Sequence, residues 1–289
     1  GTCRRQRQMC IRDSNIAVKG NFDDCQNLVK SMFSDKEFSN QINMSGVNSI
    51  NWARIIAQSV YYFYCYFLAE DDNQPINFSV PTGNFGDVYA GYLAKKLGLP
   101  INKLIVATNQ NDILHRAISK GKYEAEHVSE TISPSMDIQI ASNFERLIYD
   151  LNSHDSSQTL DDMKNIKQNG KYKIDDEKLK KINQDFLSAR MSEQETLDVI
   201  KNIYEKFNMV LDPHTAIGYG AFDKHDLKGN NIVLATAHPC KFPDAILKAI
   251  NLKSDLPDEL KFILDEEENY GIIENSFKEI KQYILGKIK

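Results

Sequence analysis

Long apolar runs are missing from this chain of 289 residues. None approaches the ~20 consecutive apolar residues that a membrane-spanning helix needs, and none resembles the apolar core of a signal peptide. Cysteine is sparse as well, with five residues, no C-x-x-C pair and no repeated spacing. Such a pattern disfavours both a disulfide framework and a zinc site. These absences predict a soluble, cytoplasmic protein with reduced thiols, no metal and no membrane partner.

A strong charge of either sign is also lacking. The 35 basic and 40 acidic residues leave a net charge of −5, which gives no reason to expect a nucleic-acid partner. No segment repeats at a fixed period, so solenoid and propeller architectures are disfavoured. The sequence does contain 42% hydrophobic residues, including 10% aromatic ones, which suffices for a sizeable core.

A strand, a glycine-containing turn and a helix follow one another near residue 80. Ile76, Phe78 and Val80 alternate with polar residues, as in a strand, and residues 88–97 show helical spacing. Between them, residues 81–87 read Pro-Thr-Gly-Asn-Phe-Gly-Asp. Such a turn directs backbone N–H groups and the positive end of a helix dipole at one spot, where an anion can bind. Taken alone, the pattern fits a plain structural turn or an anion cradle.

Strand and helix patterns alternate along most of the chain, which predicts an α/β fold with an open, mostly parallel sheet covered by helices. Charges of both signs dominate residues 152–206 without strand patterns, so we expect a helical insertion there and not a binding surface. The expected organisation is an arm (1–14), a remnant of a smaller N-terminal domain (15–47), a cofactor-binding α/β domain (48–151), the helical insertion (152–206) and a return to the α/β domain with C-terminal helices (207–289).

The arginine-rich residues 1–14 have no usable periodicity. They read either as translated sequencing adapter or as a flexible basic arm, and we exclude them from the fold. If they are an artefact, we expect that natural protein is missing upstream.

Eight segments, in the same order, resemble the threonine synthase family, whose members use pyridoxal phosphate and have the tryptophan-synthase-β-like fold, also called fold type II. Residues 80–87, continued by 90–96, resemble the phosphate cradle of that family. The resemblance extends over nearly the whole chain from Asn15 onward. The other matching segments are 20–26, 47–54, 107–114, 133–138, 142–146, 211–216 and 235–243.

The resemblance implies a site for pyridoxal 5′-phosphate. Its phosphate would be bound by backbone N–H groups of the turn, with an acidic residue nearby at the start of the helix. The residues in these positions are Gly83, Asn84, Phe85, Gly86 and Asp87. The two glycines would let the backbone approach the anion without a Cβ atom in the way.

Other site residues follow from the same resemblance. Thr236 matches the position whose hydroxyl meets the pyridine nitrogen, and a neutral hydroxyl there would leave that nitrogen unprotonated. Asn48, Ser49 and Asn51 lie where the family handles polar groups of substrate or cofactor. Each of these residues could instead be a turn or cap residue, Asn51 in particular as the cap of its helix.

One departure from the family pattern is serious. The family forms a Schiff base with a lysine in a Phe-Lys-Asp context upstream of the cradle, and no such lysine precedes Val80. Lys278, in Phe-Lys-Glu on a polar terminal helix, is a superficial match. We therefore expect a C-terminal fragment of a threonine synthase that contains no catalytic residue and is inactive alone. The whole enzyme would convert O-phospho-L-homoserine and water to L-threonine and phosphate by γ-elimination and β-hydration, as a monomer or weak homo-oligomer.

Two alternatives remain open. Another fold-type II lyase or dehydratase would share the glycine turn, but we would not expect it to share the insertion or the segments after residue 210. A non-catalytic homologue could bind a phosphorylated amino acid or a partner protein, and a genuine start near Met9 would favour it. His238 and Cys240 have poor spacing for a metal site. His214, at a helix start, is interpreted as a capping or packing residue.

Overall fold

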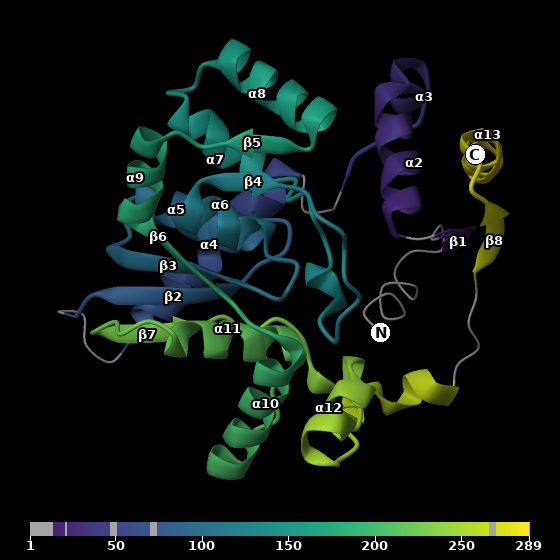
Figure 1. Cartoon of the computed structure of the whole chain (residues 1–289). Helices are drawn as coiled ribbons and strands as arrows, with labels where there is room; N and C mark the ends of the chain where they lie inside the picture. Colours follow the sequence, from purple (N-terminus) through teal and green to yellow (C-terminus); the bar gives the residue numbers. More distant parts are fainter. Residues whose placement is uncertain (1–13, 21, 47–50, 70–73, 266–269, 289) are drawn as a thin grey trace. The chain divides into compact units, whose positions relative to one another are not determined.

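The computed structural model describes residues 14–20, 22–46, 51–69, 74–265 and 270–288 (Figure 1). These residues form two compact units, which are described separately. The larger unit comprises residues 47–255, and the smaller one combines residues 1–46 with 256–289. Asn48, Ser49 and nearly all of the expected arm lie outside the described residues.

The larger unit contains the sheet and the helices that cover it. Its strands are β2 (Ile76–Pro81), β3 (Ile101–Thr108), β4 (Lys122–Glu124), β5 (Lys171–Lys173), β6 (Phe186–Arg190) and β7 (Asn230–Val233). Its helices are α4 (Trp52–Phe67), α5 (Gly86–Lys96), α6 (Ile113–Lys120), α7 (Phe144–Leu151), α8 (Ser156–Asn169), α9 (Asp176–Asp185), α10 (Glu193–Phe207), α11 (Pro213–Asp223) and α12 (Pro243–Ile250), with short 3₁₀ turns η1 (Pro134–Met136) and η2 (Pro239–Lys241).

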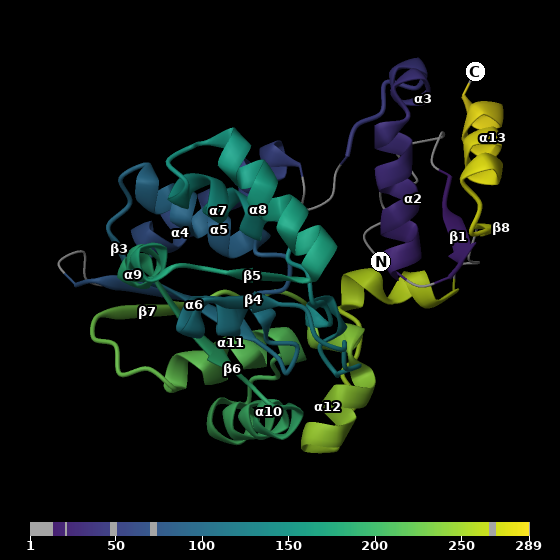
Figure 2. The same cartoon turned by 45° about the horizontal axis from the view of Figure 1, so that its top comes forward.

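The main sheet has the strand order β6-β3-β2-β7, and all three of its pairings are parallel. This confirms the predicted α/β fold with a parallel sheet. Leu104 and Val106 face the core that includes α4 and α5, whereas Ile105 and Ala107 face the core that includes α11. Figures 1 and 2 show α11 on the opposite side of the sheet from α4 and α5. Helices on both faces explain why β2 is buried at every residue.

The expected helical insertion is only partly helical. It contains β5, which pairs antiparallel with β4, and β6, which joins the main sheet beside β3. The prediction that residues 152–206 contain no strands is therefore wrong. Phe186 fits the helical spacing of the preceding apolar residues, yet it begins β6 and is fully buried. The predicted capping box of Ser192 and Glu195 is present at the start of α10.

Helix α4 is less buried than its apolar sequence predicted. Ile55, Ser59 and Tyr62 face the core, but Val60 and Phe67 are 60% and 76% exposed. The apolar side chains of α4 project from more than one side of the helix, so packing on one side buries only some of them. None of the helices in the described segments is long and apolar enough to cross a membrane.

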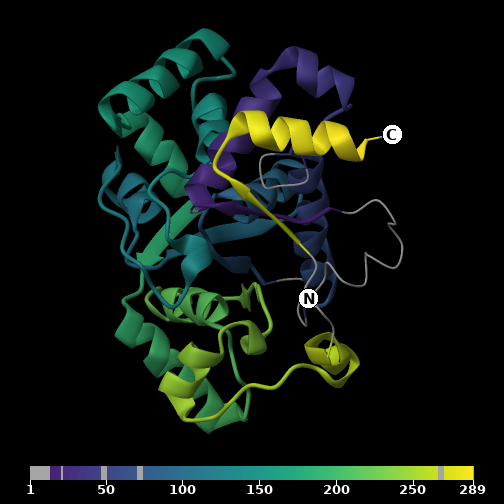
Figure 3. The same ribbon diagram turned by 90° about the vertical axis from the view of Figure 1, so that its right-hand side faces the viewer.

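The smaller unit joins the two ends of the described chain. Its elements are β1 (Ile16–Lys19), α2 (Phe22–Ser34), α3 (Lys36–Gln41), η3 (Asp258–Asp265), β8 (Gly271–Glu274) and α13 (Phe277–Lys287). Strand β1 pairs in parallel with β8 (Figure 3). Leu28, Met32, Phe38 and Ile280 form a shared core. The segment 207–289, which we expected to return to the α/β domain and to include C-terminal helices, is thus divided between the two units after residue 255.

Candidate cofactor site

Three loops meet at one edge of the main sheet, because parallel neighbours place their carboxyl ends together. Residues 82–85 follow β2, residues 109–112 follow β3 and residues 234–238 follow β7. Thr82 N donates to Ala107 O at 2.8 Å, and Leu234 N donates to Ser79 O at 3.0 Å. The predicted cradle and Thr236 therefore lie beyond adjacent strands. Strand β7 ends three residues before Thr236, earlier than the sequence predicted.

The predicted cradle is a run of five backbone amides, from Gly83 to Asp87, that donate to no acceptor within the described part of the chain. Helix α5 begins at Gly86, so the positive end of its dipole is added to these donors. Phe85, the N-cap, supplies no side-chain hydrogen bond. Gly83 and Asn84 are only half-buried. The geometry can bind a group with several acceptor oxygens.

Two features hold the cradle in shape. A Cβ atom on Gly83 would lie 2.6 Å from the carbonyl oxygen of Ser135, so the close approach of that segment requires glycine. Phe85 has a φ of 63°, which is unusual for a bulky residue, and its ring is fully buried. It packs edge-on against Phe144, with ring centroids 5.2 Å apart. This aromatic packing stabilises a strained backbone at the turn.

The side chain of Asn84 contributes to a second support. Its Oδ1 accepts a hydrogen bond from Ser142 Oγ at 3.3 Å, and its carbonyl oxygen accepts one from the amide of Asn143 at 3.1 Å. The start of α7 is thereby held against the turn.

Asp87 contributes its backbone amide to the cradle, but its carboxylate lies elsewhere. Tyr62 Oη donates to Asp87 Oδ1 at 3.2 Å and to the Asp87 carbonyl at 2.8 Å. Burial raises the pKa of Asp87 to about 6, although the Tyr62 hydrogen bond opposes the shift. The same burial, reinforced by Asp87, raises the pKa of Tyr62 well above its usual value. These contacts fasten α4 to the first turn of α5.

Thr236 belongs to a polar cluster around Asp212. The Thr236 hydroxyl lies 3.3 Å from both carboxylate oxygens, and the Thr236 amide donates to Thr215 Oγ at 3.1 Å. The sequence predicted Asp212 only as the N-cap of α11. The structure confirms that cap, with its carboxylate accepting from the amides of His214 and Thr215. The longer-range role of Asp212 had no local signal, because Thr236 lies in another loop.

His214 connects this cluster with the cradle. Its Nδ1 lies 3.0 Å from Asp212 Oδ1, and its Nε2 accepts from the amide of Ser135 at 3.3 Å. Ser135 is also the residue that approaches Gly83. The ring packs against Phe242 at 4.8 Å between centroids. His214 is thus the packing residue that was expected, but it also links the two halves of the site.

A further network shapes the loop that carries Ser135. The carboxylate of Asp137 accepts from Asn109, Asn111 and Thr131 at 2.7 to 2.9 Å. These residues fix the segment after β3 against the segment before η1. The sequence resemblance covered Asn109, Asn111 and Asp137 but indicated no role for them.

The remaining residues singled out from sequence serve local structure or belong to the smaller unit. Asn51 caps α4, with its Oδ1 accepting from Ala53 N at 2.9 Å. His238 caps η2, with its Nδ1 accepting from Cys240 N at 3.2 Å. Among the described residues, no group of three or more His, Cys, Asp or Glu side chains could hold a metal ion. Lys278 is exposed on α13 in the smaller unit.

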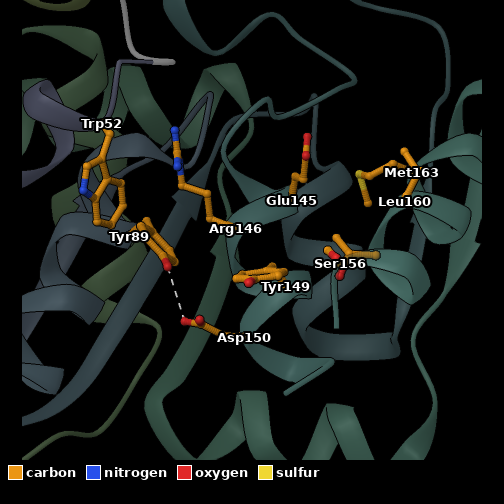
Figure 4. Close-up of a pocket in the computed structure, with 10 residues that line it drawn as sticks. Trp52, Tyr89, Glu145, Arg146, Tyr149, Asp150, Ser156, Leu160 and Met163 are labelled. Carbon is orange, nitrogen blue, oxygen red and sulfur yellow. Dashed lines mark hydrogen bonds between the residues drawn. The ribbon is translucent and has the colours of Figure 1, made fainter. Parts of the chain in front are cut away.

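A separate hollow of about 510 Å³ lies among α4, α5, α7 and α8. None of the residues predicted to hold the cofactor lines it. Trp52 and Tyr89 lie on one side, and Leu160 and Met163 on the other (Figure 4). Arg146 lies over the Trp52 ring, 5.1 Å from its centroid, and Tyr89 donates to Asp150 at 3.3 Å.

Comparison with known proteins shows which family this chain resembles. Residues 215–284 match the family described as "Threonine synthase, C-terminal". The chain is 41% identical over 286 residues to threonine synthase of Pseudomonas aeruginosa, covering 97% of this chain and 61% of that protein. It is 42% identical to the Saccharomyces cerevisiae threonine synthase, covering 95% and 60%. The chain thus spans about three fifths of the length of these relatives.

Solved structures agree with the sequence comparison. The structure of pyridoxal-phosphate-bound threonine synthase from Brucella melitensis superposes with a TM-score of 0.88 at 44% identity, over 94% of this chain and 59% of that one. Threonine synthase from yeast gives a TM-score of 0.84 at 41% identity, over 95% and 59%. The fold, the order of motifs and the sequence identity lead to one conclusion: the chain is a partial-length homologue of the threonine synthases.

Proposed function

We propose that the whole protein is a cytoplasmic threonine synthase that converts O-phospho-L-homoserine and water to L-threonine and phosphate. The observation that carries the proposal is the run of amides from Gly83 to Asp87 that find no acceptor among the described residues, in a chain 41% identical to a curated threonine synthase. In this proposal, residues 1–289 are a C-terminal fragment of the enzyme, and the lysine that binds the cofactor lies in a segment upstream.

Pyridoxal 5′-phosphate fits the residues present. Its phosphate needs several hydrogen-bond donors, and the cradle offers five consecutive amides together with the dipole of α5. Its ring nitrogen needs one polar partner, and Thr236 is exposed beyond the adjacent strand. When bound, the cofactor supplies an electron sink for carbanions at the substrate carbons.

The proposed role of the residues in this chain is to bind the cofactor and to orient it. The amides of Gly83 to Asp87 hold the phosphate, and the absence of a side chain on Gly83 lets Ser135 close over the turn. His214 connects Ser135 with Asp212, which fixes the loop bearing Thr236. Because both halves are held before any ligand arrives, little reorganisation is needed on binding. Asn48, Ser49 and Asn51 remain proposed contacts for the polar groups of the substrate.

The test compares this chain with the longer product of its gene. We expect the longer protein to release phosphate from O-phospho-L-homoserine. Residues 1–289 should bind pyridoxal phosphate reversibly, lose it on gel filtration, give no adduct after borohydride reduction and release no phosphate. Peptide mapping locates any adduct. An adduct on Lys278 accompanied by turnover would place the amine inside this chain. A longer protein that neither binds the cofactor nor releases phosphate would refute the assignment.

A further inference from the structure

Helix α4 carries a second apolar face besides the one in the core. Along this second face lie Trp52, Ile56, Val60 and Tyr64, at intervals of four residues, and then Phe67 three residues further on. These five side chains, called here the exposed face of α4, are between 43% and 76% exposed. Among the residues that the structure describes, no other helix carries more than one exposed large apolar side chain.

The exposed face of α4 contains no charged residue. Arg54 is the only charged residue of this helix, and residues 55–69 contain none. A surface helix normally directs charged and polar side chains to the solvent, whereas a helix that is apolar all round is normally buried. Clustered exposed apolar side chains therefore indicate a surface that is covered in the working protein. An uncharged face rich in aromatic residues is typical of a permanent contact.

The part of the protein that lies outside this chain indicates what covers the face. The superposition on the Brucella melitensis structure includes 94% of this chain but only 59% of that one, so a large part of the longer chain has no counterpart here. In the function proposed above, a segment that carries the lysine precedes residues 1–289. Such a segment needs an apolar surface on which to pack. Among the described elements, α4 offers the largest group of exposed apolar side chains.

We propose that the exposed face of α4 is the packing surface for the segment upstream of this chain, in the same polypeptide. This inference rests on the proposed function, which supplies that segment. The segment has to present apolar side chains here, because a buried charge opposite residues 55–69 would find no charged partner among them. When the segment is missing, the exposed face of α4 is open to a second copy of the chain, which makes residues 1–289 prone to self-association.

Hydroxyl-radical footprinting tests the inference without any substitution. Residues 1–289 and the longer product of the gene are each oxidised at several dilutions, and mass spectrometry measures the oxidation of Tyr64 and Phe67. We expect both side chains to react in highly diluted residues 1–289. In the longer protein they should react at least about tenfold more slowly at every dilution, because a packed side chain reacts only when the structure opens. Phe207 on α10, which is 55% exposed, is the internal control and should react equally in both proteins.

Val60→Asp gives an independent readout. In diluted residues 1–289, where Val60 is 60% exposed, the midpoint of thermal unfolding should stay unchanged. In the longer protein the new carboxylate would be buried without a partner, and the midpoint should fall by several degrees. The matched control is Phe207→Asp, which should leave both midpoints unchanged.

The outcomes separate the two proposals. If the longer protein releases phosphate but its Tyr64 and Phe67 react as fast as in residues 1–289, the packing surface is refuted and the proposed function stands. Protection that appears only at high concentration also refutes the packing surface, since a second copy is then the occupant. Protection in the longer protein at every dilution, without phosphate release, supports the packing surface and refutes the function. A gene that encodes no upstream segment refutes both proposals.

Discussion

Adding one methyl group to the cradle should weaken cofactor binding strongly. In Gly83→Ala the new Cβ would lie 2.6 Å from the carbonyl oxygen of Ser135 and 3.5 Å from the Cα atom of Met136. Both neighbours are backbone atoms, so relief requires a shift of the turn or of the segment around η1. That segment is held by the hydrogen bond from Ser135 to His214 and by the Asp137 network, which makes the turn the part that yields.

Overpacking of this kind costs about 1–3 kcal/mol. If the turn absorbs the strain, the amides leave their positions and the affinity for pyridoxal phosphate falls by about 5- to 150-fold, since ~1.4 kcal/mol is tenfold. Equilibrium dialysis of this chain against pyridoxal phosphate measures the change. Circular dichroism shows whether the variant is folded.

The matched control is Gly286→Ala in α13, where an added Cβ meets no atom within 4 Å. It should bind the cofactor as the wild type does. A folded Gly83→Ala chain with wild-type affinity would show that the turn does not hold the phosphate and that the proposed cradle is wrong.

Three further predictions concern the elements around the site. Because burial raises the pKa of Asp87 from 3.8 to about 6, the folded state loses stability as the pH rises between these two values; the loss is complete above pH 6 and nearly absent at pH 4. Asp87→Asn should therefore raise the free energy of unfolding at pH 8, by up to about 3 kcal/mol, but not at pH 4; equal gains at both pH values would contradict this. Tyr62→Phe removes the hydrogen bonds to Asp87 and should cost about 1 kcal/mol in denaturant unfolding; no loss would mean that those bonds add nothing. Val60→Lys with Phe67→Lys should reduce self-association of the chain in light scattering, because both side chains are largely exposed. The control Ala57→Lys, at an exposed position of the same helix, adds charge but leaves both large apolar side chains in place and should not reduce it.

The sequence predicted those features that depend on short-range patterns. The strand at Ile76, the helix after the glycine turn, the capping box at Ser192 and the cap at Asp212 all arise from residues within a few positions of each other. The motifs of the resemblance predicted the turn and Thr236 as site residues, and the structure places both beyond neighbouring strands.

The features that sequence did not predict depend on distant contacts. The spacing of Phe186 continues a helical pattern, and only pairing with β3 makes it a strand residue. The burial of α4 was overestimated because its apolar residues do not reveal how much of the helix the sheet can cover. The sequence around Asp212 would be the same with or without Thr236 nearby, so it cannot predict the contact between the two side chains. The φ of 63° at Phe85 has no sequence signal, since it requires the surrounding aromatic rings.

The pairing of β1 with β8 has a consequence for the order in which the protein folds during synthesis. Lys19 and Glu274 form an ion pair across 255 positions, and the strands of the larger unit are all translated between them. At ~5–20 residues per second, a ribosome needs on the order of ten seconds or more to supply β8 after β1 has emerged. The larger unit, whose sheet lies wholly inside that interval, can assemble in the meantime. The segment that is made before the sheet is thus completed only after it, with Leu28, Met32 and Phe38 left without Ile280 until α13 is translated.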